Sequence, residues 1–201
     1  RFSPASTFKI ANTLIALEAG AVANEKQIIP WDGQDREVAA WNQDQSLATA
    51  FPSSCVWFYQ ELAKRVGKDN YVKYLKILQY GNEQIGSEVT GFWLHGELRI
   101  SALEQIEFLK KVYRQEFPLR ASSYEILQKI MLVAQTAQYR LWAKTGWAPN
   151  GRPAVGWFVG YVASGGKVWF FATNIEIPQP DALRLRQEVT LAALRAKGII
   201  E

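Results

Sequence analysis

The sequence has very few of the residues on which several common kinds of site depend. Its single cysteine, Cys55, excludes a disulfide within the chain and is expected to be a small buried residue. No cluster of cysteine and histidine offers a metal site, and no glycine-rich phosphate loop occurs. The one histidine, His95, would have to serve any serine–histidine–aspartate triad, yet no G-x-S-x-G motif is present. We therefore expect His95 at the surface, and we expect neither a metal ion nor a cofactor.

Long apolar runs and blocks of like charge are also absent. No stretch of 18 apolar residues occurs, so nothing in this segment is expected to span a membrane. The net charge is +4, but the basic residues are scattered, which gives little support to nucleic-acid binding. The chain has no initiator methionine and begins almost at a helix start. We expect the natural protein to have residues before Arg1, and any targeting segment to lie among them.

The sequence pattern of the first two-thirds of the chain predicts helices. Capping residues, glycine stops and apolar periodicity indicate where each begins and ends. Ser101 with Glu104, and Ser122 with Glu125, have the spacing of capping boxes. The predicted helices run from about Ser6 to Glu18, Gln45 to Phe51, Ser54 to Val66, Asp69 to Leu78, Ser101 to Tyr113 and Ser122 to Met131.

The last third predicts an antiparallel sheet. Three segments rich in aromatic and β-branched residues read as strands, over 139–147, 155–163 and 167–177, and the turn "ASGG" joins the last two as a hairpin. A final helix is predicted from about Asp181 to Lys197. The layout is α+β, with residues 1–201 forming one domain. Three strands leave an open edge, which we expect strands from a missing N-terminal segment to complete.

The first predicted helix carries a serine and a lysine on one face. Ser6 and Lys9 are three residues apart, so their side chains point the same way. In one interpretation Ser6 caps the helix and Lys9 extends to solvent. In the other, Lys9 is buried and neutral, and it takes the proton of a nucleophilic Ser6.

Later segments could complete such a site. Ser54 could pass a proton, or it could only cap its helix. Lys144, Thr145 and Gly146 could supply a charge, a hydroxyl and a close approach to the backbone, or they could be an ordinary strand end. The backbone N–H after Gly146 and that of Ser6 could form an oxyanion hole.

Several of these motifs, in this order, resemble the class D β-lactamases, the oxacillinase family of serine β-lactamases. The resemblance runs from residue 1 to about 200. S-x-x-K and K-T-G are shared with other penicillin-recognising serine enzymes. The matching motifs are Ser6-Thr7-Phe8-Lys9, Ser54-Cys55-Val56, Tyr80-Gly81-Asn82, "FWLHG" around Trp93, and Lys144-Thr145-Gly146, with "WDGQDR", "WNQD", "LRIS" and "GWFVGYV" also similar.

The resemblance implies a β-lactamase/transpeptidase-like fold, with an antiparallel sheet flanked by helices and a mostly helical lobe. It also implies a catalytic set. Ser6 would be acylated by the β-lactam, and Lys9, carbamylated by CO2, would be the general base. Trp93 would donate its indole N–H to the carbamate, and Ser54 would pass a proton.

The resemblance also implies a set of substrate-binding residues. Val56 and Leu94 would lie beside the lysine, and Arg186 would lie at the substrate carboxylate. Trp41 and Trp147 would lie either at the pocket mouth or in the core. The full set is Trp41, Val56, Leu94, Lys144, Thr145, Gly146, Trp147 and Arg186.

Some consequences stay open at this point. The resemblance implies a periplasmic or secreted bacterial enzyme that acts on β-lactams, either as a monomer or as a homodimer. The alternative to this leading interpretation is the β-lactam-sensing ectodomain of a membrane receptor, which is acylated but does not turn over. His95 stands where relatives usually have an acidic residue, and nothing in the sequence selects among penicillins, cephalosporins and carbapenems.

Overall fold

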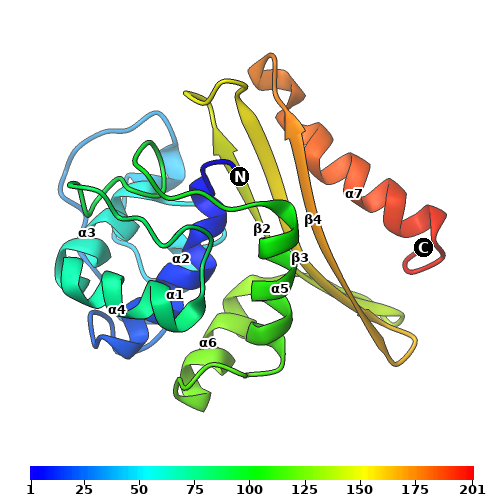
Figure 1. Ribbon diagram of the computed structural model, residues 1–201, viewed down its shortest axis with the longest axis horizontal. Coiled ribbons are helices and arrows are strands. Elements are labelled where there is room, and N and C mark those ends of the chain that lie inside the picture. Colours follow the sequence, from blue (N-terminus) through cyan, green and yellow to red (C-terminus); the bar gives the residue numbers. More distant parts are fainter.

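A four-stranded antiparallel sheet separates a helical lobe from a single C-terminal helix (Figure 1). The computed structural model describes all 201 residues. The strands lie in the order β1-β2-β3-β4. Helix α7 packs on β3 and β4, while the short 3-10 helix η1 lies against β2 on the lobe side. No helix combines the length and the apolar character that crossing a membrane would require. The elements, in chain order, are η1 (Ala5–Phe8), α1 (Lys9–Glu18), η2 (Ala39–Trp41), α2 (Leu47–Ala50), α3 (Val56–Val66), α4 (Lys68–Leu78), α5 (Ala102–Tyr113), α6 (Ala121–Met131), β1 (Leu132–Gln135), β2 (Tyr139–Ala148), β3 (Val155–Ser164), β4 (Lys167–Glu176), η3 (Pro180–Arg184) and α7 (Leu185–Ala196).

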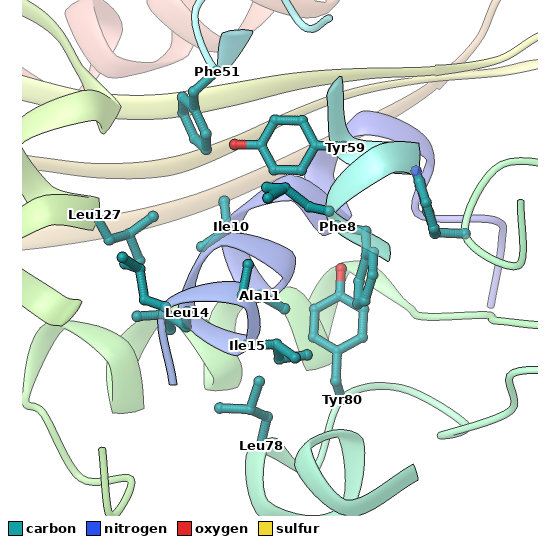
Figure 2. Close-up of a cluster of buried hydrophobic side chains, with 14 of the residues drawn as sticks. Phe8, Ile10, Ala11, Leu14, Ile15, Phe51, Tyr59, Leu78, Tyr80 and Leu127 are labelled. Carbon is teal, nitrogen blue, oxygen red and sulfur yellow. The ribbon is translucent and has the colours of Figure 1, made fainter. Parts of the chain in front are cut away.

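Helix α1 is the centre of the helical lobe. Nearly all of its residues are buried, and it contacts α3, α4 and α6 (Figure 2). Phe8, at the end of η1, packs edge-on against Tyr80 and Phe92, with ring centroids 5.3 and 5.1 Å apart. Aromatic pairs of this geometry add to the burial of their area. The start of α1, where the predicted site lies, is therefore held rigidly from several sides.

The predicted α+β layout is confirmed, and so are the three long strands. The two glycines at the β3–β4 turn have positive φ, as a tight hairpin requires. Strand β1 was not predicted. It is short and mostly exposed, and an irregularity interrupts its pairing with β2, so its own sequence has no alternation to reveal it.

The two predicted capping boxes have different outcomes. Ser101 and Glu104 form one, with the Ser101 N–H 2.8 Å from Glu104 Oε2. The Ser122–Glu125 prediction was wrong, because α6 begins at Ala121 and Ser122 lies inside its first turn. Glu18, at the end of α1, accepts hydrogen bonds from the Arg120 N–H and the Ser123 hydroxyl there. A contact between distant segments therefore satisfies the donors at the start of α6, which the local capping box was expected to satisfy.

Candidate active site

Ser6 and Lys9 meet at the junction of η1 and α1. The Lys9 side-chain nitrogen Nζ donates a hydrogen bond of 2.9 Å to Ser6 Oγ. Lys9 is fully buried, whereas Ser6 is half-buried and lines a cleft. Ser6 makes no capping hydrogen bond with its side chain. The interpretation in which Ser6 caps the helix and Lys9 reaches solvent was therefore wrong, because the lobe closes over the lysine.

Burial changes the chemistry of Lys9. It lowers the pKa of the amine from 10.5 to about 7, since an ammonium loses its hydration in an apolar site. The nitrogen lies 5.2 Å from the centre of the Tyr59 ring, and Tyr59 is itself held by a 2.8 Å hydrogen bond to Thr13. A substantial neutral fraction at physiological pH makes Lys9 able to accept a proton or to act as a nucleophile. Sequence reasoning did not identify Tyr59, because its approach to Lys9 depends on how α3 packs against α1.

Trp93 lies in a segment that is tied directly to η1. Its carbonyl accepts hydrogen bonds from the Ala5 N–H and the Ser3 hydroxyl, both at 2.9 Å. The side chain of Trp93 is fully buried, and its indole Nε1 has no hydrogen-bond partner. A buried donor without a partner is costly. The structure therefore holds an unused hydrogen-bond donor in the layer beneath the cleft.

Ser54 and Lys144 form a second hydroxyl–amine pair. Lys144 Nζ donates to Ser54 Oγ at 2.7 Å and to the carbonyl oxygen of Thr145 at 3.1 Å. The pKa of Lys144 is well below its usual value, first because the side chain is buried and then because Lys9 and Arg186 are nearby cations. Ser54 has a φ of +58°, a strained conformation for a residue with a side chain. The helix cap of α3 is Cys55, which is buried, so Ser54 is free of the capping role considered for it.

Arg186 reaches the same end of the site from α7. Its Nη1 donates a 2.8 Å hydrogen bond to the Gly146 carbonyl, and its Nε is buried without a partner. Burial lowers the pKa of the guanidinium. Its neighbour Arg184 is 77% exposed and reaches only Glu188, at 3.8 Å. Of the two arginines, Arg186 alone lines the cleft.

Gly146 has a packing role in addition to the role predicted for it, which was to let a ligand approach the strand. A side-chain carbon at this position would lie 3.0 Å from the Pro4 carbonyl oxygen and 3.0 Å from Thr7 Cγ2. Gly146 does border the cleft, but its lack of a side chain lets η1 pack closely on β2. This close packing sets the position of Ser6 relative to the strand.

A cleft of about 750 Å³ collects most of the predicted residues. Lys9 and Trp93 lie beneath its surface, and Lys144 lines an adjoining pocket. Residues 35–38, Pro149 and Leu183 complete the rim. None of them was predicted as a site residue, although Asp35 and Arg36 belong to the "WDGQDR" stretch that resembles the family. His95 is exposed, as expected, and lies 3.0 Å from Glu88. The predicted residues that line the cleft are Ser6, Trp41, Ser54, Val56, Leu94, Thr145, Gly146, Trp147 and Arg186.

The whole chain is similar to known proteins of one kind. The profile of the penicillin-binding protein transpeptidase domain matches residues 1–195. The β-lactamase OXA-48 of Klebsiella pneumoniae is 45% identical over 199 residues, which are 99% of this chain and 75% of that protein. The β-lactamase OXA-2 of Salmonella typhimurium is 45% identical over 197 residues, 98% of this chain and 70% of that protein.

Solved structures agree with the sequence relatives. The class D β-lactamase YbXI from Nostoc superposes with a TM-score of 0.97 at 45% identity, covering 99% of this chain and 84% of that one. The class D β-lactamase FUS-1 (OXA-85) from Fusobacterium nucleatum has a TM-score of 0.97 at 36% identity, covering 100% of this chain and 84% of that one.

Proposed function

The chain belongs to the class D β-lactamases, and on this premise we propose that it hydrolyses the β-lactam ring of penicillin-type antibiotics through an acyl-enzyme on Ser6. The observation that carries the proposal is the 2.9 Å hydrogen bond between Ser6 Oγ at the cleft and Lys9 Nζ beneath it. A serine hydroxyl becomes a strong nucleophile only when a base takes its proton. A buried lysine with a pKa of about 7 is positioned to meet that need. The protein would act in the periplasm or outside the bacterial cell.

Acylation would use the two hydroxyl–amine pairs in turn. Ser6 Oγ attacks the lactam carbonyl carbon while its proton passes to the base at Lys9. The carbon–nitrogen bond of the ring then breaks, and the ring nitrogen takes a proton through the Ser54 hydroxyl. The 2.7 Å contact from Lys144 holds that hydroxyl and can replace its proton.

When Ser6 attacks, negative charge develops on the lactam carbonyl oxygen, and hydrogen-bond donors must stabilise it. Ser6 is in the first turn of η1, and its backbone N–H makes no hydrogen bond within the protein. We propose it as one donor of an oxyanion hole, with the N–H of Trp147, next to Gly146 on β2, as the other. Donors fixed in place before the reaction are usually the largest single contribution to such catalysis.

The substrate carboxylate would lie at the Thr145 hydroxyl and the Arg186 guanidinium. Arg186 Nη1 is held by the Gly146 carbonyl, which fixes the direction of the side chain. A guanidinium matches the geometry of a carboxylate. Lys144 donates a hydrogen bond of 3.3 Å to the Thr145 hydroxyl and so holds that hydroxyl at this end of the cleft.

The surroundings of Lys9 fit a carbamate formed with CO2. Only a neutral amine reacts with CO2, and burial lowers the pKa of Lys9 to about 7. The unpartnered indole N–H of Trp93 is a donor that could hold a carboxylate-like group. Val56 and Leu94, which line the cleft beside Ser6, would limit water around the lysine. When formed, the carbamate would supply the general base for acylation and for activation of the hydrolytic water.

Steady turnover tests the proposal. With a chromogenic cephalosporin in large excess, we expect product to exceed the enzyme concentration many times over, because hydrolysis of the acyl-enzyme releases Ser6. The measurement is product formed against time at several enzyme concentrations. A single burst equal to the enzyme, with no turnover after it, would overturn the hydrolase proposal and match a receptor that is only acylated.

Replacing Arg186 with Ala should weaken substrate binding. A charge-assisted hydrogen bond is worth roughly 1.5–3 kcal/mol, so we expect KM to rise about 10- to 150-fold with a smaller change in kcat. Steady-state kinetics with several carboxylate-bearing penicillins measure both constants. Arg184→Ala is the matched control, because Arg184 is two residues away and exposed. Equal kinetics for both variants would show that Arg186 does not bind the carboxylate.

A further inference from the structure

A buried polar cluster lies behind η1, outside the cleft. It consists of Thr7, Tyr80 and Gln105, which are fully buried and line neither the cleft nor the pocket beside it. Gln105 extends from α5, and its Nε2 donates a hydrogen bond of 2.8 Å to Thr7 Oγ1. The Tyr80 hydroxyl lies near both side chains but forms no hydrogen bond of normal geometry. The contact from Gln105 to Thr7 is therefore the one well-formed hydrogen bond within the cluster.

Thr7 transmits this contact to the turn that carries Ser6. Its Oγ1 donates a hydrogen bond of 2.7 Å to the Pro4 carbonyl, and its N–H donates to the same oxygen at 3.1 Å. These two bonds close the turn that contains Ala5 and Ser6. Because Thr7 Oγ1 accepts from Gln105 while it donates to Pro4, the bonds form one chain, in which each strengthens the next.

The turn is strained, and contacts from outside hold it. Ala5 has a φ of +48°, in the left-handed region that residues with side chains rarely adopt. Such a conformation persists only where the surrounding structure fixes it. The Trp93 carbonyl binds the Ala5 N–H at 2.9 Å, and the contact from Gln105 to Thr7 is a second support.

The same turn sets the distance to β2. A Cβ placed on Gly146 would lie 3.0 Å from both the Pro4 carbonyl oxygen and Thr7 Cγ2. The residue after Gly146 is Trp147, whose N–H is the second donor of the proposed oxyanion hole. A shift of Thr7 therefore changes the spacing between that donor and the N–H of Ser6.

We propose that Gln105 is a positioning residue for acylation. Through Thr7 it holds Ser6 and the two oxyanion-hole donors at the spacing that the transition state requires. This inference rests on the proposed function. Gln105 does not line the cleft, so substrate binding should not depend on it. Donors fixed in advance act on charge that develops during the reaction, so the loss of Gln105 should appear in the chemical step.

The test is the variant Gln105→Met, which fills a similar space but cannot donate to Thr7. Single-turnover kinetics with a chromogenic cephalosporin measure the acylation rate constant separately from the half-saturating substrate concentration. We expect the rate constant to fall about 10- to 100-fold, with the half-saturating concentration within about twofold of wild type, since small misplacements of reacting groups have effects of this size. Thr7→Val should act in the same way, whereas Thr7→Ser, which keeps the hydroxyl, should keep most of the rate.

Two further variants separate positioning from a general loss of packing. Tyr80→Phe removes a hydroxyl of the same cluster and keeps the edge-on contact with Phe8, so it should be acylated like the wild type (Figure 2). The double variant Gln105→Met with Thr7→Val should be no slower than the slower single variant, because both substitutions remove the same bond. Circular dichroism at the assay temperature shows whether each variant is folded.

A wild-type rate constant in folded Gln105→Met would overturn this inference alone. An equal loss in Tyr80→Phe, or losses that multiply in the double variant, would also overturn it, because the effect would then not come from the hydrogen bond. If Gln105→Met does not fold, the two Thr7 variants decide, and equal rates for Thr7→Val and Thr7→Ser would overturn the inference. Absence of acylation in the wild type would instead defeat the proposed function, and this inference with it.

Discussion

Replacing Ser6 with Ala should abolish hydrolysis of every β-lactam, by a factor of at least about 10³, because no other hydroxyl can take its place. Ser54 also lines the cleft, but its Oγ accepts a hydrogen bond from Lys144 rather than from Lys9. The loss should appear in kcat, and mass spectrometry should detect no covalent adduct with a slowly hydrolysed β-lactam. The wild-type protein should gain the mass of one β-lactam under the same conditions.

The fold should survive this substitution. Ser6 caps no helix, so its removal costs only the hydrogen bond that it accepts from Lys9, about 1–3 kcal/mol. Circular dichroism and thermal unfolding would show whether the variant is folded. Ser122→Ala, at an exposed position in α6, is a control for the substitution itself. Substantial turnover by a folded Ser6→Ala protein would show that the nucleophile has been assigned wrongly.

Local sequence signals predicted the fold wherever the structure uses local contacts. The Ser101–Glu104 capping box is such a local contact, because both partners lie within one helical turn, and it was predicted correctly. The Ser122–Glu125 pair has the same spacing but fails, since Glu18, more than 100 residues away, occupies the helix start instead. Strand β1 escaped prediction for a related reason, as it depends on pairing with β2 rather than on a pattern of its own.

In the candidate site, too, the sequence predicted local contacts but not those between distant segments. Helical spacing correctly placed Ser6 and Lys9 side by side, but it left open whether Lys9 reaches solvent. Burial of the lysine depends on distant parts of the chain, such as α3, which brings the Tyr59 ring within 5.2 Å of its nitrogen. Family resemblance, not spacing, brought Arg186 into the predicted set. The packing role of Gly146 depends on how η1 lies against β2, which no local pattern in the sequence indicates.

Lys9 should make the activity depend on both pH and CO2. With a pKa of about 7, the neutral fraction of the amine falls from about nine-tenths at pH 8 to about one-tenth at pH 6. Because only the neutral amine forms a carbamate, activity should fall as the pH drops through 7. Added bicarbonate should restore part of the loss. The measurement is the initial rate against pH, in CO2-depleted and bicarbonate-supplemented buffers.

Trp93→Phe tests the proposed donor. It keeps an aromatic ring in the core but removes the indole N–H that has no other partner. The carbamate would lose a hydrogen bond worth roughly 1.5–3 kcal/mol, so this variant should need about 10- to 150-fold more bicarbonate for half-maximal activity. Trp169→Phe, at an exposed position on β4, should respond like the wild type.

The bicarbonate response is decisive because the pH profile alone is not. A free Lys9 amine acting as the base would also lose activity below pH 7, since protonation removes its lone pair. Only a carbamate makes the rate depend on dissolved CO2 at constant pH. Carbon-13 bicarbonate gives a readout independent of turnover, with a carbamate resonance expected in the wild type and absent in Lys9→Ala. Full activity in CO2-depleted buffer, no gain from bicarbonate and no such resonance would leave Ser6 a possible nucleophile, with an unmodified Lys9 as its base.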